Sequence, residues 1–405
     1  MAAPLAGVRV VEVAGWMAAP GATAMMADMG AEVIKVEPLR GDPMRHATRQ
    51  PDPAAGGAAV DASFQVDNRG KRGVAVAINQ PRGAELVRRL VADADVFVTN
   101  LLAGRQERYG LDADTLRGVN PALVHATLTG YGMHGPDAER AGYDLTAFFG
   151  RGAVLDAMTE ADAGVPPRLR PAQGDHTAAL SLLASILAAL RLAESTGEGQ
   201  VVDVNLFATA TWTMATDLSA TLVDGRNPAA SGRRSRPHAL HGGFRCADGR
   251  WLVLFMPEQR WWPPFCAAVG HPEWADDERF ADPSARAENM GELTDRLDAA
   301  FAARPLAEWA GILDEHRFIW GPASTLAEVA ADPQAEALEL FPTVTDPEAG
   351  DFRTVGAPVH VHGADIGPRG PAPAVGAHTR QVLAELGVSD AELADLTDAG
   401  VVAGA

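Results

Sequence analysis

Two short motifs contain side chains that could act as a nucleophile or as a proton donor. Asp175 follows Gly174 and precedes an apolar segment from Ala178 to Leu192 that has the composition of a buried helix. A carboxylate just before a helix most often caps the helix. The alternative is that Asp175 is a nucleophile, kept ionised by the helix dipole, that attacks an acyl carbon. Tyr143 ends a glycine-rich loop in Gly142-Tyr143-Asp144, where its phenol either donates a hydrogen bond or only packs.

An anionic ligand would need local cations, because 34 basic and 53 acidic residues give the chain a net charge of −19. Three cations lie within four residues in Asn68-Arg69-Gly70-Lys71-Arg72, just before a predicted strand. Four more arginines stand in predicted strand-exit loops, at Arg40, Arg45, Arg105 and Arg108. Charge-assisted donors of this kind bind phosphate, so the cluster predicts either a phosphate-rich ligand or a solvated turn.

Other features of the sequence exclude several partners and locations. A strongly acidic chain is a poor candidate for binding nucleic acid or an anionic membrane. The longest apolar stretch is shorter than the roughly 20 residues that span a bilayer. The amino terminus lacks the basic segment and apolar segment of a signal peptide. We therefore expect a cytoplasmic protein with neither nucleic acid nor membrane as a partner.

The sequence lacks several common motifs of metal sites, cofactor sites and catalytic nucleophiles. Two cysteines, Cys246 and Cys266, can form neither a disulfide framework nor a four-ligand zinc site. The histidine pairs of His238–His241 and His360–His362 lack further ligands at metal-binding spacing, so we expect no metal. The loop after the first predicted strand has no G-x-G-x-x-G spacing, which disfavours a dinucleotide site. Neither a P-loop nor a G-x-S-x-G elbow occurs.

The elements that would position these residues alternate between strand and helix through the first half of the chain. Near-continuous β-branched runs are typical of strands buried on both faces, so they predict an α/β fold with a parallel sheet. A ligand would then bind beyond the carboxyl ends of the strands. The predicted strands are 8–13, 31–37, 73–78, 96–99 and 122–128, and the predicted helices between them include 18–29 and 81–94.

A change of composition after residue 224 predicts the domain organisation. We expect a large domain at 1–224, a smaller α+β domain at 225–330, and a segment at 331–405 that returns to the large domain. Within the smaller domain, Phe244–Met256 is typical of a hairpin that turns at Asp248-Gly249. The tryptophans of this region either line an apolar pocket or form the core of the small domain: Trp251, Trp261, Trp262 and Trp320.

Taken in order, many short segments resemble the class III CoA-transferases of the CaiB/BaiF type. This family also contains formyl-CoA transferases, carnitine-CoA transferases and α-methylacyl-CoA racemases. No single motif is specific, but together they span nearly the whole chain. The matching segments are Pro4–Val10, Met29–Glu37, Gly41–Pro43, Asn68–Arg72, Ala94–Asn100, Gly142–Asp144, Gly174–Asp175, Thr196–Val204, Ala247–Arg250, Gly321–Pro322, Asp332–Pro333, Gly356–Pro358 and Gly376–Thr379.

The resemblance implies a Rossmann-like large domain, a small domain, and a homodimer whose two chains are threaded through each other as interlocked rings. It implies transfer of coenzyme A from an acyl-CoA donor to a carboxylic acid acceptor, with coenzyme A as substrate and no tightly bound cofactor. The family's aspartate, which forms an anhydride and then a CoA thioester, falls on Asp175. Tyr143 is the second catalytic candidate. The family's CoA contacts correspond to Trp16, Met17, Arg40, Arg72, Asn100 and Arg108.

Departures from the family's patterns narrow the expected activity. Formyl-CoA transferases have glutamine where Met17 stands and a polyglycine loop where this chain has only Gly242-Gly243. Racemases have histidine at the position of Tyr143, because racemisation needs a base on each face of the α-carbon. A phenol is a poor base at neutral pH, so the sequence favours a transferase. The alternatives are a racemase-like isomerase and a CoA-binding protein without turnover.

Overall fold

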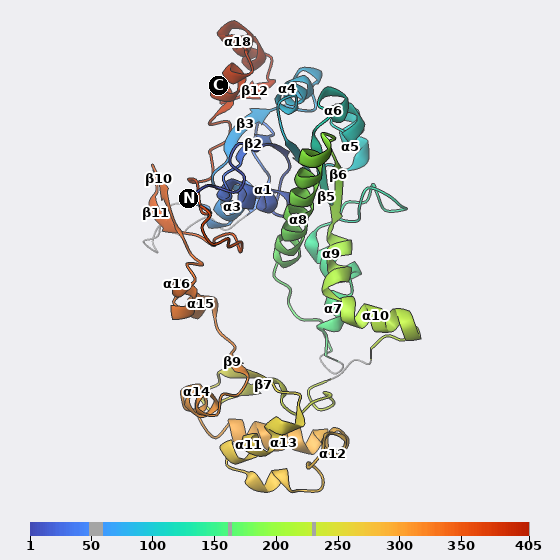
Figure 1. Ribbon diagram of the computed structural model, residues 1–405, viewed down its shortest axis with the longest axis vertical. Coiled ribbons are helices and arrows are strands. Elements are labelled where there is room, and N and C mark those ends of the chain that lie inside the picture. The colour runs from blue at the N-terminus through green and yellow to red at the C-terminus, as the bar shows by residue number, and fades with distance from the viewer. Residues whose placement is uncertain (48–59, 161–163, 229–231, 405) are drawn as a thin grey trace. The chain divides into compact units, whose positions relative to one another are not determined.

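The computed structural model describes residues 1–47, 60–160, 164–228 and 232–404 (Figure 1). The chain forms two compact units. The first contains Met1–Leu155, Arg168–Asp224 and Pro333–Ala405, and the second contains Asp156–Pro167 and Gly225–Asp332. Residues 156–167 thus group with the second unit, although the sequence analysis placed them in the large domain.

A seven-stranded sheet organises the first unit, in the order β12-β3-β2-β1-β4-β5-β6. Neighbouring strands from β3 to β6 are parallel, and β12 joins the edge antiparallel to β3. This order confirms the predicted α/β fold with a parallel central sheet. The strands are β1 (Arg9–Val13), β2 (Glu32–Glu37), β3 (Arg72–Val76), β4 (Val96–Thr99), β5 (Val124–Thr129), β6 (Val201–Asn205) and β12 (Val402–Ala403).

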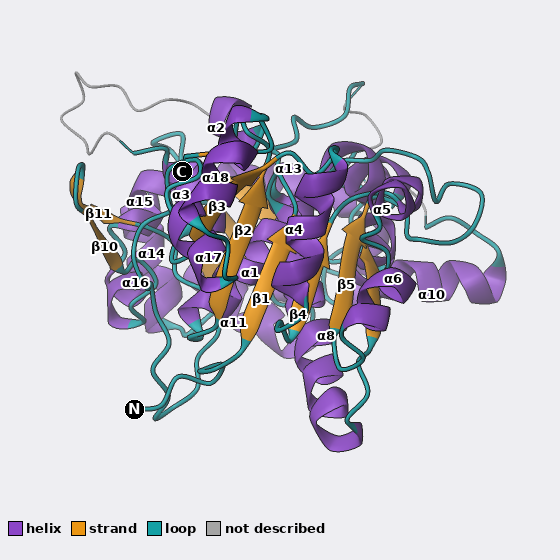
Figure 2. Ribbon diagram, turned by 90° about the horizontal axis from the view of Figure 1, so that it is seen from above, coloured by secondary structure: helices purple, strands orange, loops and turns teal. Residues whose placement is uncertain are grey.

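Helices cover both faces of this sheet (Figure 2). Successive side chains of β1 point to opposite faces, so Val10 enters one apolar cluster and Val11 enters another. The first cluster includes residues of α1 (Ala18–Asp28) and α8 (Gln173–Thr196). The second includes residues of α4 (Pro81–Val91), α6 (Ala113–Val119), α17 (Thr379–Glu385) and α18 (Asp390–Asp398).

The remaining elements of the first unit are short. They are α2 (Met44–Ala47), α3 (Ala62–Asn68), α5 (Ala103–Tyr109), the π-helical segment η2 (Asp144–Arg151), α9 (Leu206–Thr213), α10 (Ala215–Asp224), α16 (Pro333–Ala337), β10 (Thr343–Asp346) and β11 (Gly350–Arg353). Helix α7 (Val154–Ala157) lies at the boundary between the two units.

Helix α8 is long and apolar enough to cross a membrane by length and composition alone, a property that helices of protein cores share. Its side chains at Ala178, Leu182 and Ile186 are fully buried in the first apolar cluster. The same cluster contains buried residues of α1, so α8 is a core helix that packs beside α1.

The second unit has an antiparallel sheet of β7 (His241–Arg245), β8 (Trp251–Phe255) and β9 (Trp320–Pro322). The predicted hairpin is confirmed, and Gly249 has the positive φ of 79° that its turn requires. Trp262 is a core residue, whereas Trp251 is 43% exposed. The helices are η3 (Gln259–Trp261), α11 (Trp262–Ala268), η4 (Pro272–Ala275), α12 (Pro283–Glu288), α13 (Met290–Phe301), α14 (Leu306–Glu315) and α15 (Leu326–Ala330).

Candidate active site

The loop that leaves β1 lies where the strand order reverses. Strand β1 pairs with β2 on one side and with β4 on the other, the place at which open α/β sheets bind ligands. The side chain of Asn100, just after β4, reaches across to this loop. Its Nδ2 donates to the carbonyl oxygen of Gly15 at 2.8 Å, and its Oδ1 accepts from the Gly15 N–H at 3.3 Å. Asn100 therefore holds the loop that continues into Trp16 and Met17.

Trp16 contacts Tyr143 at this edge of the sheet. The two ring centroids are 5.3 Å apart, with an interplanar angle of 77°. Trp16 has a positive φ of 69°, which is unfavourable for a residue with a bulky side chain, and its N–H donates to Asp42 Oδ1 at 3.1 Å. The Tyr143 side chain is 54% exposed, so it is less enclosed than a packed core ring.

The amino terminus of α8 is fixed by Asp144, the neighbour of Tyr143. Ala172 precedes the helix with a positive φ of 79°, and its N–H donates to Asp144 Oδ2 at 2.7 Å. Burial raises the pKa of the Asp144 carboxyl, although hydrogen bonds from backbone N–H groups oppose the shift. A Cβ on Gly174 would lie 2.7 Å from Phe148 Cβ. Gly174 thus allows η2 to pack closely against α8.

Asp175 lies in the first turn of α8 and does not cap the helix, which corrects the expectation from its sequence context. Burial, together with the charges of Asp144 and Asp67, raises the pKa of this carboxyl to about 7 against the opposing effect of His176. No group in the described part of the chain donates a hydrogen bond to it. Near neutral pH the ionised form is a stronger base than an ordinary carboxylate, and a stronger base is a better nucleophile.

His176 was missed by the sequence analysis. Its Nε2 lies 3.1 Å from Oδ1 of the buried Asp67, which raises the pKa of the imidazole above its usual value. A protonated imidazole beside Asp175 favours the ionised carboxylate. The sequence signal was the order Asp175-His176, but nothing local indicated Asp67 as the partner of the histidine.

The three cations of the basic cluster at 68–72 are all paired with carboxylates. Arg69 and Lys71 are buried and paired with Asp28 at 2.6 Å and Glu12 at 2.7 Å, respectively. Arg72 begins β3, at the amino end of a strand, and pairs with Glu32 and Glu385. The carboxyl ends of the strands form the opposite edge of the sheet. Arg72 therefore lies at the other edge of the sheet from the loop after β1.

Arg40 and Arg108 remain available for an anion. Both side chains are exposed, and neither forms an ion pair within the described residues. Arg40 follows β2 and Arg108 lies in the last turn of α5, the helix that follows β4. The described residues contain no group of three or more His, Cys, Asp or Glu side chains that could hold a metal ion.

Comparison with known proteins finds relatives that match nearly the whole chain. The family described as CoA-transferase family III matches residues 5–379. The (R)-2-hydroxy-4-methylpentanoate CoA-transferase of Clostridioides difficile is 31% identical over 98% of this chain and 99% of its own length. The succinate–glutarate CoA-transferase of Agrobacterium fabrum is 32% identical over 95% of this chain and 96% of its own. A crystal structure of a CAIB/BAIF family protein from Brucella suis has a TM-score of 0.82 and 32% identity, and it covers 95% of this chain and 100% of that protein.

Proposed function

Because the chain belongs to CoA-transferase family III, we propose that it moves coenzyme A from an acyl-CoA to a carboxylic acid through covalent intermediates on Asp175. The observation that carries this proposal is the carboxyl of Asp175 at the start of α8. It is half-buried, it accepts no hydrogen bond from a described residue, and its pKa is raised to about 7.

The first half of the reaction loads coenzyme A onto the enzyme. The Asp175 carboxylate attacks the thioester carbonyl of the donor, the C–S bond breaks, and CoA leaves as a thiolate. The thiolate then attacks the aspartyl carbonyl of the mixed anhydride. This step releases the donor as a free carboxylate and leaves an aspartyl-CoA thioester.

The second half reverses these steps with the acceptor acid. The acceptor carboxylate attacks the aspartyl thioester and displaces the CoA thiolate, which forms a new mixed anhydride. The thiolate attacks the acceptor's acyl carbon, a new thioester forms, and Asp175 leaves as a carboxylate. No net proton is exchanged. In this scheme the phenol of Tyr143 donates a hydrogen bond to the reacting carbonyl oxygen.

We propose that the coenzyme lies along the edge formed by the loop after β1. Trp16, Met17 and Asn100 would contact its pantetheine part, and the exposed guanidinium groups of Arg40 and Arg108 would meet its phosphates. We do not include Arg72 among the proposed CoA contacts, because its guanidinium is already paired with Glu32 and Glu385.

We also propose that the functional form is a homodimer of interlocked chains, located in the cytoplasm. Large apolar side chains stand exposed on α9 and α10, among them Trp212 (78%) and Val223 (89%), and a second chain would cover them. Threaded chains cannot separate without unfolding. Sedimentation at nanomolar protein should therefore show a dimer, and a folded monomer would contradict interlocking.

The test of the chemistry is transfer between a panel of acyl-CoA donors and carboxylate acceptors, followed by mass spectrometry. The wild type should exchange coenzyme A with at least one pair, and borohydride added during turnover should reduce the thioester on Asp175. Solvent deuterium at the α-carbon of a 2-methylacyl-CoA without acyl exchange would instead support a racemase. Binding of CoA without exchange would support a protein without turnover.

A further inference from the structure

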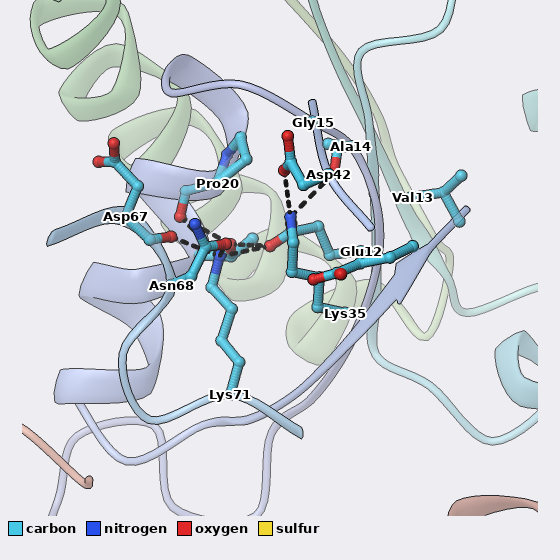
Figure 3. Close-up of polar contacts among 12 residues, drawn as sticks. Glu12, Val13, Ala14, Gly15, Pro20, Lys35, Asp42, Asp67, Asn68 and Lys71 are labelled. Atoms are coloured by element: carbon cyan, nitrogen blue, oxygen red, sulfur yellow. Dashed lines mark hydrogen bonds and ion pairs between the residues drawn. The ribbon is translucent and has the colours of Figure 1, made fainter. Parts of the chain in front are cut away.

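The chain has only two lysines among its 34 basic residues, and both are buried against one carboxylate. Lys35 Nζ lies 2.7 Å from Glu12 Oε1, and Lys71 Nζ lies 2.7 Å from Glu12 Oε2 (Figure 3). The side chains of all three residues have no exposed area. Glu12 is the fourth of the five residues of β1, so these charges lie between the sheet and the helix that covers it.

Each ammonium group also bonds one end of the loop from Ala14 to Pro20. Lys35 Nζ donates to the Ala14 carbonyl at 3.0 Å, where the loop leaves β1. Lys71 Nζ donates to the Pro20 carbonyl at 2.9 Å, in the first turn of α1. Trp16 and Met17 lie between these two anchors. The network of Glu12, Lys35 and Lys71 therefore clamps both ends of the loop from the interior of the unit.

A third connection reaches the middle of the loop. Lys35 Nζ lies 2.9 Å from Asp42 Oδ2, and the other oxygen of Asp42 accepts the N–H of Trp16. Trp16 is the loop residue with the unfavourable positive φ. Such backbone persists only where the surroundings enforce it, and the chain from Lys35 through Asp42 to Trp16 supplies that constraint.

The chemistry of the two cations explains why they are lysines in an arginine-rich chain. An ammonium group is a compact charge with three donors in a tetrahedral arrangement, whereas a guanidinium is a planar fork. Lys35 donates to Glu12 and to the Ala14 carbonyl, and it forms an ion pair with Asp42. Two cations, Lys35 and Lys71, balance the two carboxylates of Glu12 and Asp42, so the network is neutral.

We propose that Glu12, Lys35, Lys71 and Asp42 are positioning residues that hold the loop from Ala14 to Pro20 in the shape that receives the coenzyme A thioester. This inference rests on the proposed function. The four residues do not touch the reacting atoms. Their effect should therefore fall on substrate binding rather than on the chemical step.

The central test is the double variant Lys35→Met/Asp42→Asn, which removes one charge of each sign and leaves the Glu12–Lys71 pair. The matched control is Arg69→Met/Asp28→Asn, which neutralises another buried ion pair of the same unit, at the far end of α1. We expect the KM for acyl-CoA to rise about 10-fold or more in the first variant, with kcat within about threefold of the wild type. In the control we expect an unchanged KM at a similar loss of thermal stability. An unchanged KM in a folded first variant, or an equal rise in the control, would overturn the proposal.

Two further measurements keep the proposal testable if the double variant does not fold. Asp42→Asn alone leaves Lys35 bonded to Glu12 and Ala14, and it should raise KM several-fold; no change would count against the network. Amide hydrogen exchange of the peptide 14–20 needs no substrate. It should be faster in Asp42→Asn than in the wild type and unchanged in the Arg69→Met/Asp28→Asn control. If the wild type binds no CoA, the proposed function fails, whereas unchanged exchange in Asp42→Asn overturns the positioning role itself.

Discussion

The two segments that meet at the candidate site differ in whether their buried carboxylates are paired with ammonium groups. Behind the loop after β1, the ammonium groups of Lys35 and Lys71 surround Glu12; burial alone would raise the pKa of this carboxyl, but the two cations lower it to about 2. At the start of α8, Asp144 and Asp175 are neighbouring carboxylates without such cations. Burial raises the pKa of both, and that of Asp175 reaches about 7.

This difference distinguishes a carboxylate that holds a loop in place, Glu12, from one that can react, Asp175. A compensated carboxylate such as Glu12 keeps its charge throughout the physiological range, so the loop that it supports keeps one shape. A buried carboxylate without an ammonium partner, such as Asp175, is less stable as an anion and is therefore more basic. Strongly shifted groups of this kind cluster at functional sites, while paired groups more often serve the structure.

The largest expected effect is the loss of transfer in Asp175→Asn, by about a thousandfold or more, because the amide cannot attack a thioester. The same change should stabilise the fold above pH 7. The native pKa of Asp175 lies above its unfolded value, so native stability falls as the pH rises from about 4 to about 7. The variant does not lose this stability. Its free energy of unfolding, measured in urea at pH 8, should therefore exceed that of the wild type by on the order of 1 kcal/mol.

A matched control for that variant is Asp390→Asn, whose side chain is 92% exposed on α18. It should leave transfer unchanged and lower the free energy of unfolding by less than about 1 kcal/mol, because its exposed ion pair with Arg380 contributes little. If Asp175→Asn were less stable than the wild type at pH 8, the Asp175 carboxylate would be stabilised by its surroundings as Glu12 is, and the contrast between the two residues would be wrong.

Glu12→Gln should have the opposite effect on stability. Removing one partner from a buried ion pair leaves the other charge uncompensated, which costs about 3–5 kcal/mol. The native pKa of Glu12 lies below its unfolded value, so its contribution is present above about pH 4.5 and is lost as the pH falls toward 2. Urea unfolding at pH 7 and at pH 3 should show a smaller difference between variant and wild type at the lower pH. An equal difference at both would contradict the assignment.

Tyr143→Phe tests whether the exposed edge of the site takes part in chemistry. If the phenol donates a hydrogen bond to the developing oxyanion, its removal should lower kcat about 10-fold, on the scale of a weaker oxyanion donor. The Trp16 ring contact should persist because the phenylalanine ring keeps the same place. Single-turnover kinetics would measure this directly, and an unchanged rate would make Tyr143 a packing residue.

Asp144→Asn removes one of the two neighbouring carboxylates at the start of α8. The amide oxygen of the substituted side chain can still accept the N–H of Ala172, so the fold should lose only about 1 kcal/mol, the scale of a helix cap. Without the Asp144 charge, the pKa of Asp175 should fall. The acid limb of the kcat profile should therefore move to lower pH. A limb that stays in place would show that the Asp144 charge does not contribute to the pKa of Asp175.

The sequence predicted the parts of the fold that depend on local pattern. Runs such as 31–37 and 96–99 indicated buried parallel strands, and Asp248-Gly249 indicated the hairpin of the second unit. The same runs predicted that Asn100 and the loop at Gly15 lie at one edge of the sheet, since each follows the end of a strand.

The sequence could not predict which charges are already paired. Asp28, Glu12 and Glu385, the partners of Arg69, Lys71 and Arg72, lie 41, 59 and 313 residues away along the chain, so a local cluster of cations looks free when it is not. The prediction that Asp175 caps α8 was wrong for the same reason. Asp144 lies 28 residues before Ala172 in the chain and accepts its N–H, whereas Asp175 lies in the first turn and does not cap the helix.

The smallest expected effects separate a paired arginine from an unpaired one. Arg72→Gln should leave CoA affinity unchanged, because its guanidinium is bonded to Glu32 and Glu385 at the amino end of β3; these partly exposed pairs contribute about 0–1 kcal/mol of stability. Arg108→Gln should weaken CoA binding several-fold, since an exposed cation without an ion-pair partner among the described residues can meet a phosphate. Calorimetry at two salt concentrations distinguishes the two sites. The loss in Arg108→Gln should shrink at high salt, because screening weakens the same attraction in the wild type. A salt-sensitive loss in Arg72→Gln instead would mean that CoA displaces the two glutamates, and the ligand edge would have to extend to the other end of the sheet.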